Sequence, residues 1–333
     1  MANRDLVAIG ASAGGVEALV LLCTKLPAQF PAAILVTQHL PSHSNSVLDQ
    51  LLSRAGPLPA KFADHGDPLR RGQIFLAPPG RHLIADGDRL LLGKGPRENH
   101  VRPAIDPMLR SVAVCCGPRA IGVVLTGTLG DGASGLKAIQ QCGGISVVQD
   151  PEDAAFPEMP RTALNRSVPD HIVRLADLPL LLNSLVQRPA EEPKPVPEAV
   201  RFEVGIASGQ KSSMRDMDRL GRRSVLICPD CNGVMWKIDD HELSHYRCHV
   251  GHAYGADMMA LALDENLRRA LGSALRALEE RIALTEKLRW QASDRGHNQS
   301  ADSWARKIEE IEKEADALRK TIIRIDEVTD RAA

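Results

Sequence analysis

The sequence lacks three features that would place it in a specialised class of protein. Its 41 basic and 42 acidic residues leave a net charge of −1, so no basic excess points to nucleic acid. No hydrophobic run approaches the length of a transmembrane helix. Its seven cysteines, an odd number, fit a reducing compartment better than a disulfide framework. No leader segment precedes the first apolar run, and we expect a cytoplasmic globular protein.

The N-terminal part of the chain has the pattern of an α/β protein. Between residues 1 and 187, short apolar runs alternate with segments of helical periodicity. Strands are predicted at 6–9, 32–38, 74–77, 120–126 and 145–149, a hairpin at 82–92, and helices at 16–26, 45–53, 105–116, 133–142, 158–166 and 177–187. Apolar strands separated by amphipathic helices predict a doubly wound, mostly parallel sheet with helices on both faces. Ligands of such sheets bind beyond the carboxyl ends of the strands.

A glycine-rich turn follows the first predicted strand. Gly10-Ala11-Ser12-Ala13-Gly14 matches the nucleophile-elbow pattern G-x-S-x-G, with a helix predicted from Val16 onward. The next helix would direct its backbone N–H groups and the positive end of its dipole toward Ser12. Two other readings stay open at this point. A dinucleotide-binding G-x-G-x-x-G loop has the same context, although Ser12 replaces its middle glycine, and the turn could also be purely structural.

Two further strand ends carry polar residues that suit a hydrolase. His39 follows the second apolar run, and Asp131 lies in a glycine-rich turn after the run 120–126. A serine hydroxyl needs a base to take its proton, and a carboxylate fixes the tautomer of the histidine that acts as that base. If the three strands are neighbours, Ser12, His39 and Asp131 can converge. Their order along the chain differs from that of the α/β-hydrolases.

Each member of this group also has a plainer interpretation. Asp131 could cap the helix that is predicted from Ala133. His39 could be a structural residue at the end of a strand. Four other histidines are rival bases: His43, His65, His82 and His100.

Several motifs, in order along the chain, resemble the catalytic domain of the CheB family of protein-glutamate methylesterases. They are Gly10-Ala11-Ser12-Ala13-Gly14-Gly15, Gln38-His39-Leu40-Pro41, Ile74-Phe75-Leu76-Ala77-Pro78, Arg102-Pro103-Ala104-Ile105-Asp106 and the turn 125–133 with Asp131. The resemblance covers about residues 5–187. It implies that Ser12 is the nucleophile, His39 the base and Asp131 the group that orients it. The implied substrate is a glutamyl methyl ester on a chemoreceptor, and the family also deamidates certain receptor glutamines.

The sequence departs from the family pattern in two places. Thr128 stands where a methionine is usual and Leu129 where a glycine is usual, in the turn that supplies an oxyanion-hole N–H. We expect the backbone N–H groups of Ala13 and Thr128 to form this hole, and the backbone near Leu129 to differ. The family's receiver domain has no counterpart before the first strand, so we expect no activation by phosphorylation of such a domain.

A second chemical motif lies nearer the C-terminus. Residues 188–224 are rich in proline and predict a semi-extended, unpacked linker that keeps the next segment apart from the sheet. In the segment 225–257, Cys228, Cys231 and Cys248 have the spacing of a structural zinc site, with two short strands between them. His252 or His249 would be the fourth ligand, and we favour His252 because His249 is adjacent to Cys248. A small module with reduced thiols and no metal is the alternative.

The final segment, 258–333, predicts long helices. Apolar residues recur at helical spacing from Leu267 to Ile282 and in a heptad pattern from Trp304 to Ile325, with a break at 293–299. An antiparallel hairpin and a dimerising coiled coil both fit, and the helices could instead pack on the cysteine segment. The cysteine segment before these helices, with its Cys-Pro-x-Cys, Cys and Gly-His-Ala-Tyr motifs, resembles extensions found on some relatives that lack a receiver domain.

The sequence therefore favours a serine esterase that needs no catalytic cofactor and acts on the cytoplasmic part of a membrane receptor. The rivals are a nucleotide-binding regulatory domain and a catalytically quiet scaffold. Gln38-His39 stands where a ribose-binding acid would be expected, which disfavours the first. The presence of Ser12, His39 and Asp131 disfavours the second.

Overall fold

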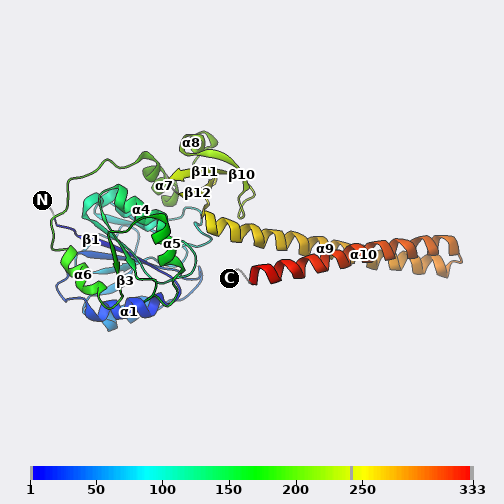
Figure 1. The fold of residues 1–333 in the computed structure, drawn as a ribbon, viewed down its shortest axis with the longest axis horizontal. Helices are drawn as coiled ribbons and strands as arrows, with labels where there is room; N and C mark the ends of the chain where they lie inside the picture. Colours follow the sequence, from blue (N-terminus) through cyan, green and yellow to red (C-terminus); the bar gives the residue numbers. More distant parts are fainter. Residues whose placement is uncertain (1–2, 241–242, 331–333) are drawn as a thin grey trace. The chain divides into compact units, whose positions relative to one another are not determined.

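The structure is a computed structural model that describes residues 3–240 and 243–330 of the 333-residue chain. The chain divides into two compact units, one ending at Met259 and the other beginning at Ala260. The first unit contains a parallel sheet with its helices and a small antiparallel sheet (Figure 1). The second unit contains most of a pair of long helices. Within the described residues, no helix is both long and apolar enough to cross a membrane.

The central sheet has seven parallel strands in the order β3-β4-β2-β1-β7-β8-β9. The strands are β1 (Leu6–Ala11), β2 (Ala33–Gln38), β3 (Ala60–Phe62), β4 (Ile74–Leu76), β7 (Ala120–Val124), β8 (Ile145–Gln149) and β9 (His171–Val173). β1 lies between β2 and β7, so the strands that precede Ser12, His39 and Asp131 are neighbours. This adjacency is the condition that convergence of the three side chains requires.

Helices cover both faces of the sheet and bury two separate cores. On one face, α1 (Gly15–Lys25), α2 (Leu48–Ala55) and α6 (Leu178–Leu185) pack against β1 and β2. On the other, α3 (Ile105–Cys116), α4 (Ala133–Gln141) and α5 (Glu158–Arg166) pack with the hairpin β5–β6 (His82–Asp86, Arg89–Gly93) (Figure 1). The predicted doubly wound α/β fold is thus confirmed. The short strands β3 and β9 were not predicted, since their three residues form no continuous apolar run, unlike the fully buried β4 of the same length.

The proline content predicted an unpacked linker over residues 188–224, and this prediction is wrong. The segment contains α7 (Glu198–Ser208), which packs on α3, and α8 (Met214–Leu220). Val200, Ile206 and Met217 are buried on these helices. The prolines are concentrated before residue 198, where they exclude helix without preventing one from starting just after them.

A four-stranded antiparallel sheet carries the cysteines. It consists of β10 (Arg222–Ile227), β11 (Val234–Asp240), β12 (Leu243–Cys248) and β13 (Ala253–Gly255), and residues 222–255 are called the cysteine module below. The two predicted short strands correspond to β11 and β12. The sheet begins at Arg222, before the predicted boundary at 225, because β10 pairs with β11.

A buried ionic cluster joins the cysteine module to the α/β layers. Glu203 of α7 accepts hydrogen bonds from Arg247 (2.8 Å) and His245 (2.9 Å) of β12. Glu98, in the loop before α3, accepts from Arg247 (3.0 Å) and from Arg110 of α3. All five side chains are less than one-tenth exposed. The prediction that a linker keeps the module apart from the sheet is therefore wrong. Buried charges need partners in place of water, and here the partners lie on both sides of the boundary between the module and the α/β layers.

The C-terminal helices form an antiparallel pair, α9 (Ala256–Asp294) and α10 (Asn298–Asp330) (Figure 1). Ile308, Ile311 and Ala315 of α10 are buried, and Arg319 of α10 donates to Glu279 of α9 at 2.7 Å. The apolar residues of the heptad pattern thus pack between two helices of the same chain. Of the two arrangements that fit the sequence, the structure has the antiparallel hairpin. A homodimer through these helices stays a prediction.

Breaking the ionic cluster should destabilise the first unit. We expect Glu203→Gln to lower the free energy of unfolding by roughly 3–5 kcal/mol, because the buried Arg247 and Arg110 would then share the single carboxylate of Glu98. Glu198→Gln is the matched control on the same helix, where the side chain is 86% exposed and forms an ion pair with Arg219. Urea unfolding of both variants measures the difference in the free energy of unfolding. Equal stability of the two variants would contradict the claim that the ionic cluster stabilises the first unit.

Candidate functional site

Ser12, His39 and Asp131 form a continuous hydrogen-bonded chain at the carboxyl edge of the sheet. His39 Nδ1 lies 3.0 Å from Ser12 Oγ, and His39 Nε2 lies 2.8 Å from Asp131 Oδ2. Ser12 and His39 directly follow β1 and β2, and Asp131 lies in the loop between β7 and α4. The structure thus brings together the three residues that the sequence singled out.

Asp131 is a buried carboxylate surrounded by hydrogen-bond donors. The backbone N–H groups of Ile105 (2.6 Å) and Asp106 (3.2 Å), at the N-terminus of α3, donate to it. Burial alone would raise the pKa of Asp131, but the hydrogen bonds from His39 and from these two N–H groups lower it to about 2. The carboxylate is therefore ionised across the physiological range, stabilised by the end of a helix.

The ionised carboxylate determines the tautomer of His39. Asp131 can only accept a hydrogen bond, so His39 Nε2 must carry the proton. The lone pair of Nδ1 then faces the Ser12 hydroxyl at 3.0 Å. A neutral imidazole in this tautomer is the form that can accept the serine proton.

The turn that carries Ser12 is held from several sides. The Ser12 N–H donates to Thr126 O (3.0 Å), and Gln38 Nε2 donates to Ser12 O (2.8 Å). Gly14 has φ 71°, in the left-handed region that favours glycine. A Cβ on Gly127 would lie 2.7 Å from the Ser12 Cβ, so glycine is required for this approach. The serine is therefore presented by a rigid turn.

The two backbone N–H groups that are expected to bind an oxyanion are those of Ala13 and Thr128. Among the described residues, no hydrogen-bond acceptor is found for the N–H of Ala13 or of Thr128. Thr128 lies in the loop after β7, next to Gly127, which contacts Ser12. Unpaired N–H groups beside a serine hydroxyl are the donors that an oxyanion hole requires.

Leu129 lies in the turn after β7 with a backbone conformation that favours glycine. Leu129 has φ 71°, so it holds the left-handed conformation that a glycine would adopt, and its side chain is partly exposed. The turn thus keeps a glycine-like path at the cost of local strain.

The interpretation of Asp131 as a helix cap does not match the structure, and two of the rival histidines have other partners. The N-cap of α4 is Gly132, not Asp131, whose carboxylate faces the N-terminus of α3 instead. His82 is buried and bonded to the backbone at Pro96 and Ala104, and His65 accepts from the Leu92 N–H. Among the described side chains, only the imidazole of His39 is hydrogen-bonded to Ser12.

Two polar residues near Asp131 were missed by the sequence analysis as site residues. Asn99 Nδ2 donates to Asp131 Oδ1 (3.2 Å) and lies 3.4 Å from Asp106 Oδ2. Asp106 Oδ1 accepts from the Gly135 N–H at 2.6 Å. Burial and then the charge of Asp131 raise the pKa of Asp106 to about 7. The only signal in the sequence was the polar stretch before the helix at 105, which has no periodicity.

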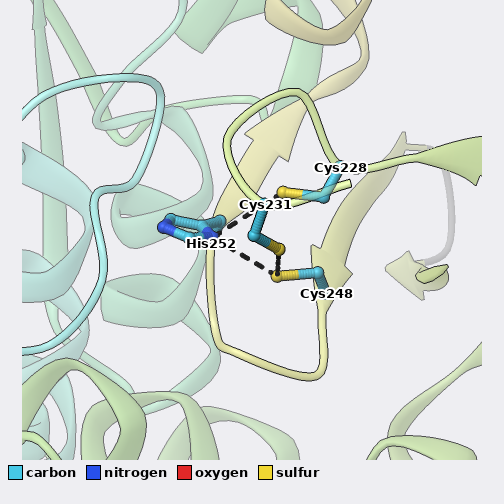
Figure 2. Close-up of side chains that lie close together, drawn as sticks. All are labelled: Cys228, Cys231, Cys248 and His252. Atoms are coloured by element: carbon cyan, nitrogen blue, oxygen red, sulfur yellow. Dashed lines mark hydrogen bonds between the residues drawn. The ribbon is translucent and has the colours of Figure 1, made fainter. Parts of the chain in front are cut away.

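The cysteine module brings Cys228, Cys231, Cys248 and His252 together, as Figure 2 shows. Their ligand atoms all lie within 4.8 Å of one another. Cys228 and Cys231 belong to the turn after β10, Cys248 ends β12, and His252 precedes β13. His249 is not part of the group, and its ring lies beside Gly233. Three thiols and one imidazole could bind a metal ion.

Three of the six separations between the ligand atoms of this cluster match those of a tetrahedral ion. Zn–S bonds of about 2.3 Å and Zn–N bonds of about 2.0–2.1 Å imply ligand separations of about 3.8 Å for two sulfurs and about 3.5 Å for sulfur and nitrogen. Cys231 Sγ lies 3.7 Å from Cys248 Sγ, and His252 Nδ1 lies 3.5 and 3.7 Å from the sulfurs of Cys248 and Cys228. His252 Nε2 lies 3.9 Å from Asp230, a carboxylate of the kind that orients metal-ligating histidines.

A parallel α/β sheet with a serine, a histidine and a buried aspartate in one hydrogen-bonded chain has the arrangement of an α/β serine hydrolase. Comparison with known proteins narrows this class. The CheB methylesterase family model matches residues 7–182. The crystal structure of the Thermotoga maritima CheB methylesterase catalytic domain is 30% identical, with a TM-score of 0.53, over 56% of this chain and 100% of that chain.

Two curated relatives agree with this match. "Putative protein-glutamate methylesterase/protein-glutamine glutaminase" of Leptospira interrogans is 34% identical over 57% of this chain and 99% of its own length. Protein-glutamate methylesterase/protein-glutamine glutaminase 2 of Anaeromyxobacter dehalogenans is 37% identical over 56% of this chain and 54% of its own. The chain belongs to the CheB methylesterase family.

The raised pKa of Asp106 should appear in the pH dependence of stability. The unfolded chain releases this proton near pH 3.8 and the folded chain only near 7, so the folded state loses stability as pH rises between these values. We expect Asp106→Asn to remove this loss, so that the variant gains stability relative to the native chain from pH 4 to 7 and no more above 7. Denaturant unfolding at several pH values measures it. Asp88→Asn, at a side chain 94% exposed, is the control, and parallel profiles for the native chain and Asp106→Asn would show that Asp106 is ionised throughout.

Proposed function

We propose that this chain is a protein-glutamate methylesterase that uses Ser12 as its nucleophile. The single observation that carries the proposal is the hydrogen-bonded chain from Ser12 through His39 to the buried carboxylate of Asp131. Membership of the CheB methylesterase family supports the choice of substrate class. The names of the relatives extend the proposal to deamidation of glutamines, which proceeds through the same acyl intermediate with ammonia as the leaving group.

The proposed reaction has two halves. Ser12 Oγ attacks the carbonyl carbon of the glutamyl ester while His39 Nδ1 takes the hydroxyl proton. Asp131 stabilises the imidazolium, and the N–H groups of Ala13 and Thr128 stabilise the tetrahedral oxyanion. The intermediate collapses, the C–O bond to the methoxy group breaks, and methanol leaves with the proton from His39. Water, activated by His39, then hydrolyses the acyl-serine and releases the glutamate side chain.

The substrate and its location follow from the same proposal. A glutamyl methyl ester on a receptor-like signalling protein is the substrate class that the family indicates. We place the chain in the cytoplasm, where the signalling part of a membrane receptor would be accessible. No cofactor enters the proposed reaction, because the base, the orienting group and the oxyanion donors all belong to this chain.

Removing any member of the triad should abolish most of the activity. We expect Ser12→Ala, His39→Ala and Asp131→Asn each to lower kcat by roughly 10³-fold or more, with double variants little worse than single ones. Release of methanol from a glutamyl methyl ester peptide measures the rate. Ser44→Ala, at a serine outside the triad, is the control. Near-native methanol release by Ser12→Ala would contradict the proposal.

The cysteine module is proposed to bind one structural Zn²⁺ through Cys228, Cys231, Cys248 and His252. The donor set suits zinc, and three of the six ligand separations match a tetrahedral ion. A segment of about thirty residues has a small core, and a metal ion would supply much of its folding free energy.

Two neighbouring histidines give a matched test of the metal site. We expect one zinc per native chain, loss of zinc in His252→Ala, and native zinc content in His249→Ala, because only His252 Nδ1 faces the sulfurs. Elemental analysis of reduced, untagged protein measures the content. Metal-free native protein, or equal zinc in both variants, would contradict the assigned ligand set.

A further inference from the structure

The loop before α3 contains a strained pair of residues. Asn99 and His100 have φ values of 50° and 65°, in the left-handed region that non-glycine residues rarely adopt. Two consecutive residues persist there only when their surroundings hold them. In this structure the surroundings are supplied by the cysteine module.

Strand β13 holds Asn99 through both its backbone and its side chain. The Asn99 N–H donates to Ala253 O (2.8 Å), and the Gly255 N–H donates to Asn99 Oδ1 (3.0 Å). Asn99 is 6% exposed, so these bonds are shielded from water. The amide oxygen must face Gly255, because an N–H group requires an acceptor.

The other end of the same amide reaches the proposed triad. With Oδ1 on Gly255, Nδ2 is directed at Asp131 Oδ1 (3.2 Å). Asp131 Oδ2 is the oxygen bonded to His39. One buried side chain therefore connects a strand of the cysteine module to the carboxylate that orients the proposed base.

The cysteine cluster lies next to β13, the strand that holds Asn99. β13 follows His252, and its Tyr254 hydroxyl donates to Asp230, which lies between Cys228 and Cys231. The Tyr254 ring contacts the His100 ring edge-on, with centroids 4.8 Å apart. The arrangement of the cluster thus determines where β13 lies against Asn99 and His100.

We propose that Asn99 is a positioning residue of the hydrolase site, which the docked cysteine module holds against Asp131, so that turnover at Ser12 depends on an intact cysteine cluster. The inference rests on the proposed function. When the cluster is disrupted, β13 releases the Asn99 amide, and the strained loop relaxes away from Asp131. Asp131 Oδ1 then loses its side-chain donor, and the backbone N–H groups of Asp106 and Gly132 that remain on this oxygen orient the carboxylate less exactly toward His39. Catalytic groups displaced by a fraction of an ångström to 1 Å lower rates by about 10- to 100-fold.

Two substitutions at Asn99 separate positioning from mere anchoring of the module. Asn99→Asp keeps the acceptor for Gly255 and tolerates a left-handed backbone, but it replaces the donor to Asp131 with a like charge. Asn99→Gly keeps the backbone and removes the side chain. We expect both to lower kcat at least tenfold on a small methyl ester with little change in KM, and Asn99→Asp to be the more severe. Asn183→Asp on α6 is the control. Native kcat for Asn99→Asp would overturn the proposal.

A cysteine variant tests the dependence on the cluster. In the full chain, Cys231→Ser should lower kcat at least tenfold in the native background and have little further effect in the Asn99→Gly background, because both changes remove one connection. Native kcat for Cys231→Ser, or additive losses in the double variant, would overturn the proposal.

Hydrogen exchange gives a readout that does not need turnover. The amides of Ile105 and Asp106 should exchange faster in Asn99→Gly and Cys231→Ser, while β7 and β8 stay protected and show that the sheet is folded. Unchanged protection at Ile105 and Asp106 would overturn the proposal. If the native chain shows no hydrolysis that depends on Ser12, the proposed function fails. Exchange at the Ile105 and Asp106 amides then still tests whether Asn99 connects the module to Asp131.

Discussion

The site depends on one interaction, the burial of the Asp131 carboxylate against the N-terminus of α3. A buried charge is stable only where donors replace water, and the N–H groups of Ile105 and Asp106 do so together with His39. Because the carboxylate stays ionised, the imidazole has one defined tautomer with its free nitrogen on Ser12. The parallel order β2-β1-β7 brings the three strand ends to this point.

The cysteine module is built into the same unit rather than attached to it. Arg247 of the module pairs with Glu203 and Glu98, and Glu98 also pairs with Arg110 of α3. The helix whose first turn binds Asp131 is thus also connected to the module, through Arg110 and Glu98. The proposed site is therefore positioned by two sets of elements. One is the strand ends of the parallel sheet, and the other is α3 with the loop that precedes it, which the module holds.

Much of the fold and the proposed triad could be predicted from sequence, because apolar runs that end in glycine-rich turns mark the carboxyl ends of buried strands. The bounds of α3, β8 and α5 agree with the prediction at both ends. The role of Asn99 could not be predicted, since its partners Asp131 and Gly255 are distant in sequence and its loop has no periodicity. The pairing of Glu203 with Arg247 could not be predicted either, because the two residues are distant in sequence and meet only once the chain is folded. Helix α7 was missed because the prolines before it dominated the composition.

Reaction with a fluorophosphonate probe, followed by identification of the modified peptide, tests the central claim most directly, because the probe bonds to a serine that an adjacent base has activated. The account predicts that the probe modifies Ser12 in the native chain, and that the modification is lost in His39→Ala although the serine is still present. Modification of a different residue, or equal labelling of Ser12 with and without His39, would contradict it.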